Sequence, residues 1–232
     1  MYETRLRENL PRIREAIEDA ARRSGRGEGE VTLVAVTKAH PPEALRAALN
    51  LGMKDLGENR LEEMEEKVRL LGRDAATWHM VGHVQSRKAR LAVELADLVH
   101  SVDSLKLGRR LSRFAQEEAR TLPVLVQVNT GEEEAKSGFS PDGAVERIHE
   151  LVELPRLDVR GLMTMAPFVE DESVLRDTFV GLRMIHERAL DAVPGYGGTE
   201  LSMGMTNDFE LAVEEGSTMV RIGTALFGER PR

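Results

Sequence analysis

One lysine stands where an amine could do chemistry. The run VTLVAVTKAHP places Lys38 directly after an apolar stretch, residues 31–37, that is typical of a buried strand. The sequence holds six lysines among its 32 basic residues, and the other five fall on predicted helices or loops. An amine at the end of a buried strand is partly desolvated, which favours its neutral, nucleophilic form. Lys38 is therefore either a Schiff-base nucleophile for an aldehyde or an ordinary solvated strand end.

Two loops near the end of the chain could hold an anion. LSMGMTND offers Ser202, Gly204 and Thr206, and RIGTALFG offers Gly223 and Thr224. Hydroxyl and glycine residues before a helix let backbone N–H groups converge on a phosphate, although each loop alone could be a helix cap with a glycine turn. An amine with a phosphate site suggests pyridoxal phosphate. A Schiff-base aldolase acting on a sugar phosphate would need the same two features, so both remain open.

These residues must be positioned by the elements around them, and the sequence alternates short apolar runs with amphipathic helical stretches. Eight strands are predicted, at residues 31–37, 55–57, 78–82, 98–101, 123–129, 159–165, 200–203 and 218–223. Helices are predicted after seven of them, at residues 42–51, 60–71, 87–95, 104–120, 142–153, 172–193 and 207–214.

Such alternation favours a parallel sheet, and eight units in about 200 residues favour closure as a (β/α)8 barrel. Leu6, Leu10, Ile13 and Ile17 predict one extra N-terminal helix, which either begins at Asn9 or kinks there because of Pro11. We expect one α/β domain over residues 1–232. In a barrel, the ends of all strands meet at one mouth, and phosphates often bind after strands seven and eight.

Composition excludes several classes of protein. The chain has no cysteine, which removes disulfides, thiolate metal sites and cysteine nucleophiles. Its formal net charge of −8 argues against general nucleic-acid binding. No apolar run approaches the roughly 20 residues of a membrane span, and the N-terminus has no apolar signal core. We therefore expect a cytoplasmic protein without membrane contact.

Other polar residues allow more than one interpretation. His79, in the third predicted strand, could face a bound ring or be a hydrogen-bonded core histidine, while His83 and Gln85 are expected at the rim of the site. The acidic run at residues 132–134 is more typical of a solvated surface than of a metal site, because no histidine or aspartate accompanies it at ligand spacing. We predict no metal.

The motifs together resemble those of the pyridoxal phosphate homeostasis proteins (the YggS/PROSC family) over nearly the whole chain. The matching stretches are VAVTK with Lys38, GENR at 57–60, WHMVGHVQSRK at 78–88, VNTGEEEAKSG at 128–138, GLMTMAP at 161–167, LSMGMTND at 201–208 and VRIGTALFG at 220–228. The resemblance implies an alanine-racemase-like barrel, without that enzyme's C-terminal β-domain, that binds pyridoxal 5′-phosphate.

The resemblance also assigns roles to residues. Lys38 would hold the cofactor as a Schiff base, Asn59 would approach the ring hydroxyl, and Arg221 would face the pyridine nitrogen. An arginine there disfavours protonation of that nitrogen, which makes the ring a poorer electron sink. The phosphate would be held by Ser202, Met203, Thr206, Gly223 and Thr224. Arg87 and Thr206 depart from the family pattern, in which asparagine and serine are common.

The family is regarded as carrying, buffering or delivering the cofactor, without an established reaction. The only tyrosines, Tyr2 and Tyr196, belong to no recognisable catalytic motif, so two-sided proton transfer has no evident second acid or base. The expectation is a non-catalytic carrier that could contact apo-enzymes transiently. The alternative is a racemase or decarboxylase of the same fold type. Absence of the β-domain, which supplies the racemase dimer interface, favours a monomer.

Overall fold

The eight strands close into a parallel barrel in the computed structural model, which describes residues 2–131 and 137–229. They pair in sequence order, and β1 returns to β8 with Thr32 opposite Met219. The strands are β1 Thr32–Val36, β2 Asp55–Glu58, β3 Thr77–Met80, β4 Leu98–Val102, β5 Leu122–Gln127, β6 Leu157–Met163, β7 Glu200–Ser202 and β8 Met219–Ile222. The predicted α/β barrel is confirmed.

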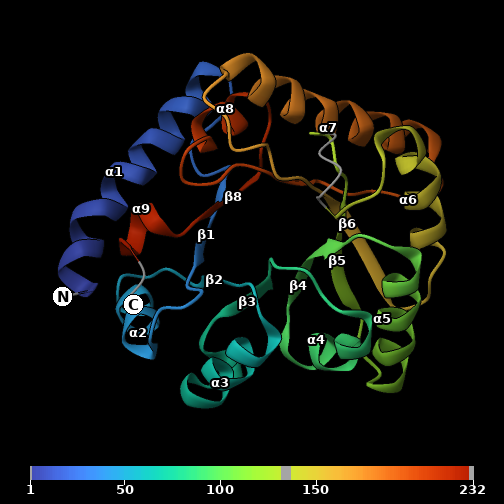
Figure 1. The fold of residues 1–232 in the computed structure, drawn as a ribbon, viewed down its shortest axis with the longest axis horizontal. Helices are drawn as coiled ribbons and strands as arrows, with labels where there is room; N and C mark the ends of the chain where they lie inside the picture. The colour runs from blue at the N-terminus through green and yellow to red at the C-terminus, as the bar shows by residue number, and fades with distance from the viewer. Residues whose placement is uncertain (1, 132–136, 230–232) are drawn as a thin grey trace.

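Helices surround the strands on the outside of the barrel (Figure 1). They are α1 Tyr2–Arg23, α2 Pro42–Asn50, α3 Leu61–Leu71, α4 Ala89–Leu95, α5 Leu105–Glu117, α6 Ala144–Val152, α7 Glu172–Ala192, α8 Phe209–Glu214 and α9 Thr224–Phe227. Within the described part of the chain, 3-10 turns lie at Arg73–Ala75, Ser86–Lys88 and Pro141–Gly143. Among the described residues, no helix is both long and apolar enough to cross a membrane.

The extra N-terminal helix is longer than its sequence suggested. It runs without interruption from Tyr2 through Pro11, so of the two alternatives considered for Pro11 a start at Asn9 is wrong. Pro11 lies on the exposed side, whereas Leu6, Leu10 and Ile13 are buried on the side that faces the barrel. Packing of this apolar face outweighs the backbone hydrogen bond that proline removes.

The short helix α9 follows β8 and was not predicted. Its four residues are too few to show helical periodicity in sequence. It lies beside α1 in Figure 1 and is tied to it, since Arg5 Nη1 donates to the carbonyl of Phe227 at 2.6 Å. Asn9 Nδ2 donates to the carbonyl of Leu226 at 3.2 Å. The N-terminal helix therefore packs over the junction between the last and first units of the barrel.

Candidate functional site

A cavity of about 610 Å³ lies at the carboxyl ends of the strands. Its lining comes from strand ends and from the segments after β1, β2, β3, β5, β6, β7 and β8, as the barrel geometry predicts. Six of the eight predicted site residues line it, namely Lys38, Asn59, Thr206, Arg221, Gly223 and Thr224. Ser202 and Met203 are fully buried and are not among the lining residues.

Lys38 lies in a tight turn two residues beyond β1. The next residue, Ala39, has a φ of 59°, a left-handed conformation that is uncommon outside glycine. Two side chains of α3 hold this turn: Ala39 N–H donates to Glu63 Oε1 at 2.6 Å, and Lys67 Nζ donates to the Thr37 carbonyl at 2.7 Å. The backbone on both sides of Lys38 is therefore fixed by α3.

A buried ion pair lies behind this turn. Glu58, at the end of β2, is fully buried and accepts from Lys67 Nζ at 2.7 Å, and Lys67 also reaches Glu63 at 2.7 Å. The Thr37 hydroxyl donates to the same Glu58 oxygen. Burial raises the pKa of Glu58 to about 7, and the opposing effect of Lys67 offsets this only in part.

This shift predicts a pH-dependent stability. Between the ordinary pKa of 4.5 and about 7, the folded protein retains a proton on Glu58 that the unfolded chain releases. The free energy of unfolding should therefore fall as pH rises through this window, by about 3 kcal/mol relative to Glu58→Gln. Urea unfolding of both proteins from pH 4.5 to 8 measures the difference. Parallel curves would show that Glu58 does not titrate in this range.

The loops after β7 and β8 lie together, as predicted from sequence. The Thr206 hydroxyl accepts from the backbone N–H of Ala225 at 3.5 Å, which joins one loop to the other beside Thr224. Gly204 is required here, because its φ is +94° and an added Cβ would lie 2.6 Å from the Cβ of Ala212. The two hydroxyls and the adjacent backbone form a polar part of the cavity wall that suits an anion.

Arg221 lies on the inner side of the cavity, on β8, and is almost fully buried. Its Nη1 donates to Ser202 Oγ at 2.7 Å, and its Nη2 donates to the carbonyl of Thr164 at 2.9 Å. Burial lowers the pKa of Arg221 to about 10, so the group stays cationic at neutral pH. The structure thus presents a rigid guanidinium to whatever occupies the cavity.

The Ser202 hydroxyl already takes part in two hydrogen bonds with other side chains of the barrel. Besides Arg221, it contacts His100 Nδ1 at 2.9 Å. The predicted phosphate contacts of Ser202 and Met203 remain predictions, and a direct contact from the Ser202 hydroxyl would require a change in these bonds. Sequence could not show this, because Ser202 and Arg221 lie on separate strands.

Asn59 is placed by a close approach of two loops. An added Cβ on Gly82 would lie 2.2 Å from the carbonyl oxygen of Asn59, so only glycine permits this spacing. His83 follows in the same loop and lines the cavity, with Nδ1 at 2.8 Å from Asp103 Oδ2. His79 does not line this cavity; it is a buried, hydrogen-bonded histidine, the second of the two interpretations.

Several lining residues were missed by sequence reasoning. Gln127 ends β5, and its side-chain amide donates to the carbonyl of Ser137 at 2.7 Å. The segment after β6 adds Met165, Pro167 and Phe168. Phe168 is 91% exposed, which is unusual for phenylalanine. The GLMTMAPF motif carried a signal for this segment, whereas Gln127 resembled an ordinary strand residue.

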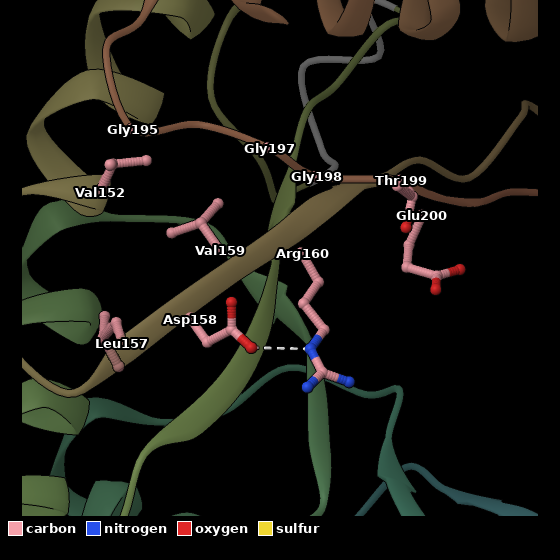
Figure 2. Close-up of a pocket in the computed structure, with 10 residues that line it drawn as sticks. All are labelled: Val152, Leu157, Asp158, Val159, Arg160, Gly195, Gly197, Gly198, Thr199 and Glu200. Carbon is pink, nitrogen blue, oxygen red and sulfur yellow. Dashed lines mark hydrogen bonds and ion pairs between the residues drawn. The ribbon is translucent and has the colours of Figure 1, made fainter.

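Separate cavities lie at the opposite end of the barrel. One cavity of about 430 Å³ lies between the start of β6 and the glycine-rich loop before β7 (Figure 2). The side chains of Asp158 and Arg160 point together there, with Arg160 Nε 2.7 Å from Asp158 Oδ2. None of the predicted site residues lines it.

The remaining sequence observations do not add to the cavity. Arg87 is exposed in the 3-10 turn before α4 and donates to Gln85 Oε1 at 2.9 Å, and it is not a lining residue. The acidic run at residues 132–134 lies outside the described residues. Within residues 2–131 and 137–229, no group of three histidine or acidic side chains is arranged to hold a metal ion.

Comparisons with known proteins agree with this architecture. Residues 8–231 match the family of the alanine racemase N-terminal domain. The chain is 39% identical over 223 residues to the pyridoxal phosphate homeostasis protein of Aquifex aeolicus, covering 96% of this chain and 97% of that one.

Two solved structures are similar along most of the chain. A protein from Bifidobacterium adolescentis has a TM-score of 0.90 at 36% identity, covering 97% of this chain and 96% of that one. PipY of Synechococcus elongatus PCC7942, solved with PLP bound, has a TM-score of 0.81 at 37% identity, covering 91% of this chain and 100% of that one.

Proposed function

The chain belongs to the pyridoxal phosphate homeostasis proteins, within the family of the alanine racemase N-terminal domain, and we propose that it binds pyridoxal 5′-phosphate through Lys38. One observation carries the proposal. An amine, a buried guanidinium and two threonine hydroxyls line the same cavity: Lys38, Arg221, Thr206 and Thr224. These groups complement the aldehyde, the ring nitrogen and the phosphate of this cofactor.

The residues present fit such a group. The cavity volume of about 610 Å³ lies in the usual range for small-molecule sites. When bound, the cofactor supplies an aldehyde that reacts with amines and a ring that can take up electrons. Lys38 would supply the amine, while Thr206, Gly223 and Thr224 would hold the phosphate. Asn59 would lie near the ring hydroxyl, and Arg221 would keep the ring nitrogen unprotonated.

We propose that the bound cofactor is carried rather than used in a reaction. Tyr196 is buried and its hydroxyl pairs with His186 Nδ1 at 2.8 Å, while Tyr2 pairs with His40 at 3.2 Å, and neither lines the cavity. A transfer assay tests this role: loaded protein, freed of unbound cofactor, should reactivate an apo-enzyme. If the apo-enzyme stays inactive while the cofactor remains on this protein, delivery to enzymes is excluded and storage of the cofactor remains as its role.

A second candidate function, an amino-acid racemase or decarboxylase, rests on the pair of His83 and Asp103 at the cavity. His83 is 54% exposed, and with Lys38 it would give the cavity a second group able to move a proton. Deuterium exchange at the α-carbon of a panel of amino acids separates the two functions. Exchange well above that of free cofactor, and lost in His83→Ala, would establish the enzyme and overturn the carrier.

Phosphate binding by the β7 and β8 loops gives a further prediction. Thr206→Val keeps the shape but removes the hydroxyl, and should weaken binding of pyridoxal 5′-phosphate by roughly tenfold, the order expected for a lost bond to a charged group. Binding of pyridoxal, which has no phosphate, should change little. Fluorescence titration with both compounds measures this, and an equal loss for both would place Thr206 away from the phosphate.

The proposal extends to the domain organisation, oligomeric state, location and partners of the protein. Residues 1–232 would act as one cofactor-binding domain, as a monomer in the cytoplasm, with apo-enzymes as transient partners. Sedimentation at working concentrations, with and without cofactor, tests the monomer.

A further inference from the structure

A chain of hydrogen bonds runs through the inside of the barrel. Four bonds join five side chains: Arg221 Nη1 to Ser202 Oγ at 2.7 Å, Ser202 Oγ to His100 Nδ1 at 2.9 Å, His100 Nε2 to His79 Nδ1 at 2.9 Å, and His79 Nε2 to Asp55 Oδ1 at 3.0 Å. Both histidines are buried.

The chain connects the two ends of the barrel. Arg221 lines the cofactor cavity, whereas Asp55 and His79 line a separate cavity of about 680 Å³ at the amino ends of the strands. The members come from β2, β3, β4, β7 and β8. Because its members come from five strands, this chain of hydrogen bonds could not be predicted from local sequence. It ends on Arg221, the residue proposed to face the ring nitrogen.

All four hydrogen bonds donate in the same direction, from Arg221 toward Asp55. A guanidinium can only donate, so Ser202 Oγ accepts from Arg221, and the Asp55 carboxylate accepts from His79 Nε2. With both histidines neutral, Ser202 donates to His100 Nδ1 and His100 Nε2 donates to His79 Nδ1. In these four bonds, each donated hydrogen then has an acceptor atom, and each acceptor atom receives one hydrogen.

The opposite direction is unfavourable. A His79 cation would donate to His100, and His100 would donate to Ser202, whose own hydrogen would then lack an acceptor among the contacts of the described residues. It would also place a second cation near Arg221. Burial, with His79 and Arg221 nearby, lowers the pKa of His100 well below its usual range, which agrees with a neutral ring.

We propose that Asp55, His79 and His100 are positioning residues that act through Ser202 to hold Arg221 against the cofactor ring. The effect on the cofactor rests on the proposed function, whereas the direction of the chain does not. The consequence is long-range control: a change at Asp55, in the opposite mouth of the barrel, should alter how the cofactor is held.

The first test uses the ligand-free protein. Long-range ¹H–¹⁵N spectra of the histidine rings should show His79 and His100 neutral at pH 7, each carrying its hydrogen on Nε2. Assignments come from His79→Phe and His100→Phe. A hydrogen on His100 Nδ1, or an imidazolium at either residue, would overturn the proposed chain whether or not the protein binds the cofactor.

The second test measures cofactor binding in variants. His100→Phe and Asp55→Ala should weaken binding on the order of tenfold and change the pH dependence of the bound cofactor's spectrum, since each leaves a buried partner unpaired. Asp55→Asn should restore both, because its side-chain oxygen still accepts from His79.

A matched control separates positioning from loss of packing. His186 is also a buried histidine, bonded to Tyr196 and remote from Arg221 in the hydrogen-bond network, so His186→Phe should leave affinity and spectrum unchanged. Wild-type affinity and spectrum in both His100→Phe and Asp55→Ala would overturn the proposal. Absence of binding by the wild type would instead contradict the proposed function.

Discussion

Lys38→Ala is expected to abolish the visible absorbance that pyridoxal 5′-phosphate gives when it is bound as a Schiff base. Among the described residues that line the cavity, Lys38 carries the only amine, so the loss should be complete. Weak non-covalent binding through Thr206, Thr224 and Arg221 should persist, since the rest of the cavity is unchanged. Absorbance after mixing and desalting measures the covalent part, and fluorescence quenching measures the remainder.

Lys54→Ala is the matched control for this variant. Lys54 is exposed just before β2, at the opposite end of the barrel from the cavity. Its removal should leave the absorbance at the wild-type level. If Lys38→Ala retains the visible band while Lys54→Ala or another lysine variant loses it, the attachment site proposed here is wrong.

Lys67→Met should cause the largest loss of stability among the single changes considered. It leaves Glu58 buried beside Thr37 without its cation, and breaking a buried ion pair costs about 3–5 kcal/mol. The cost should be smaller below pH 7, where Glu58 can take up a proton. The Lys38 turn should also loosen, because Lys67 no longer holds the Thr37 carbonyl. Urea unfolding at pH 8 measures the first effect.

A double variant tests whether the pair is the cause. Glu58→Gln combined with Lys67→Met removes both charges, and at pH 8 it should recover at least half of the loss. Lys54→Met, an exposed lysine changed in the same way, should alter stability by less than about 0.5 kcal/mol. No recovery in the double variant would mean that the loss comes from the packing of Lys67 instead of its charge.

Much of the architecture could be predicted from sequence because it follows from periodicity. The alternation of apolar runs and amphipathic stretches located all eight strands to within two residues at each end. It failed at α9, which is too short to show a period, and at the start of α1, where the local rule for Pro11 gave way to packing against the barrel.

The candidate site could be predicted only in part. Residues at strand ends, such as Lys38 and Thr206, were found because a barrel brings those ends to one mouth. Pairings across strands were not, because sequence does not give the register between elements. The contact of Lys67 with Glu58, and that of Ser202 with His100, required the closed barrel. Lys67 resembled an ordinary helical lysine in sequence, yet its side chain is buried.

Reduction of the loaded protein with borohydride, followed by peptide mass spectrometry, directly tests whether the cofactor is attached through Lys38. We expect one phosphopyridoxyl adduct, on the peptide that contains Lys38. Such an adduct also excludes the cofactor-free aldolase, which would instead trap its substrate on this lysine. An adduct confined to other lysines, or none after incubation with pyridoxal 5′-phosphate, would rule out attachment of the cofactor through Lys38.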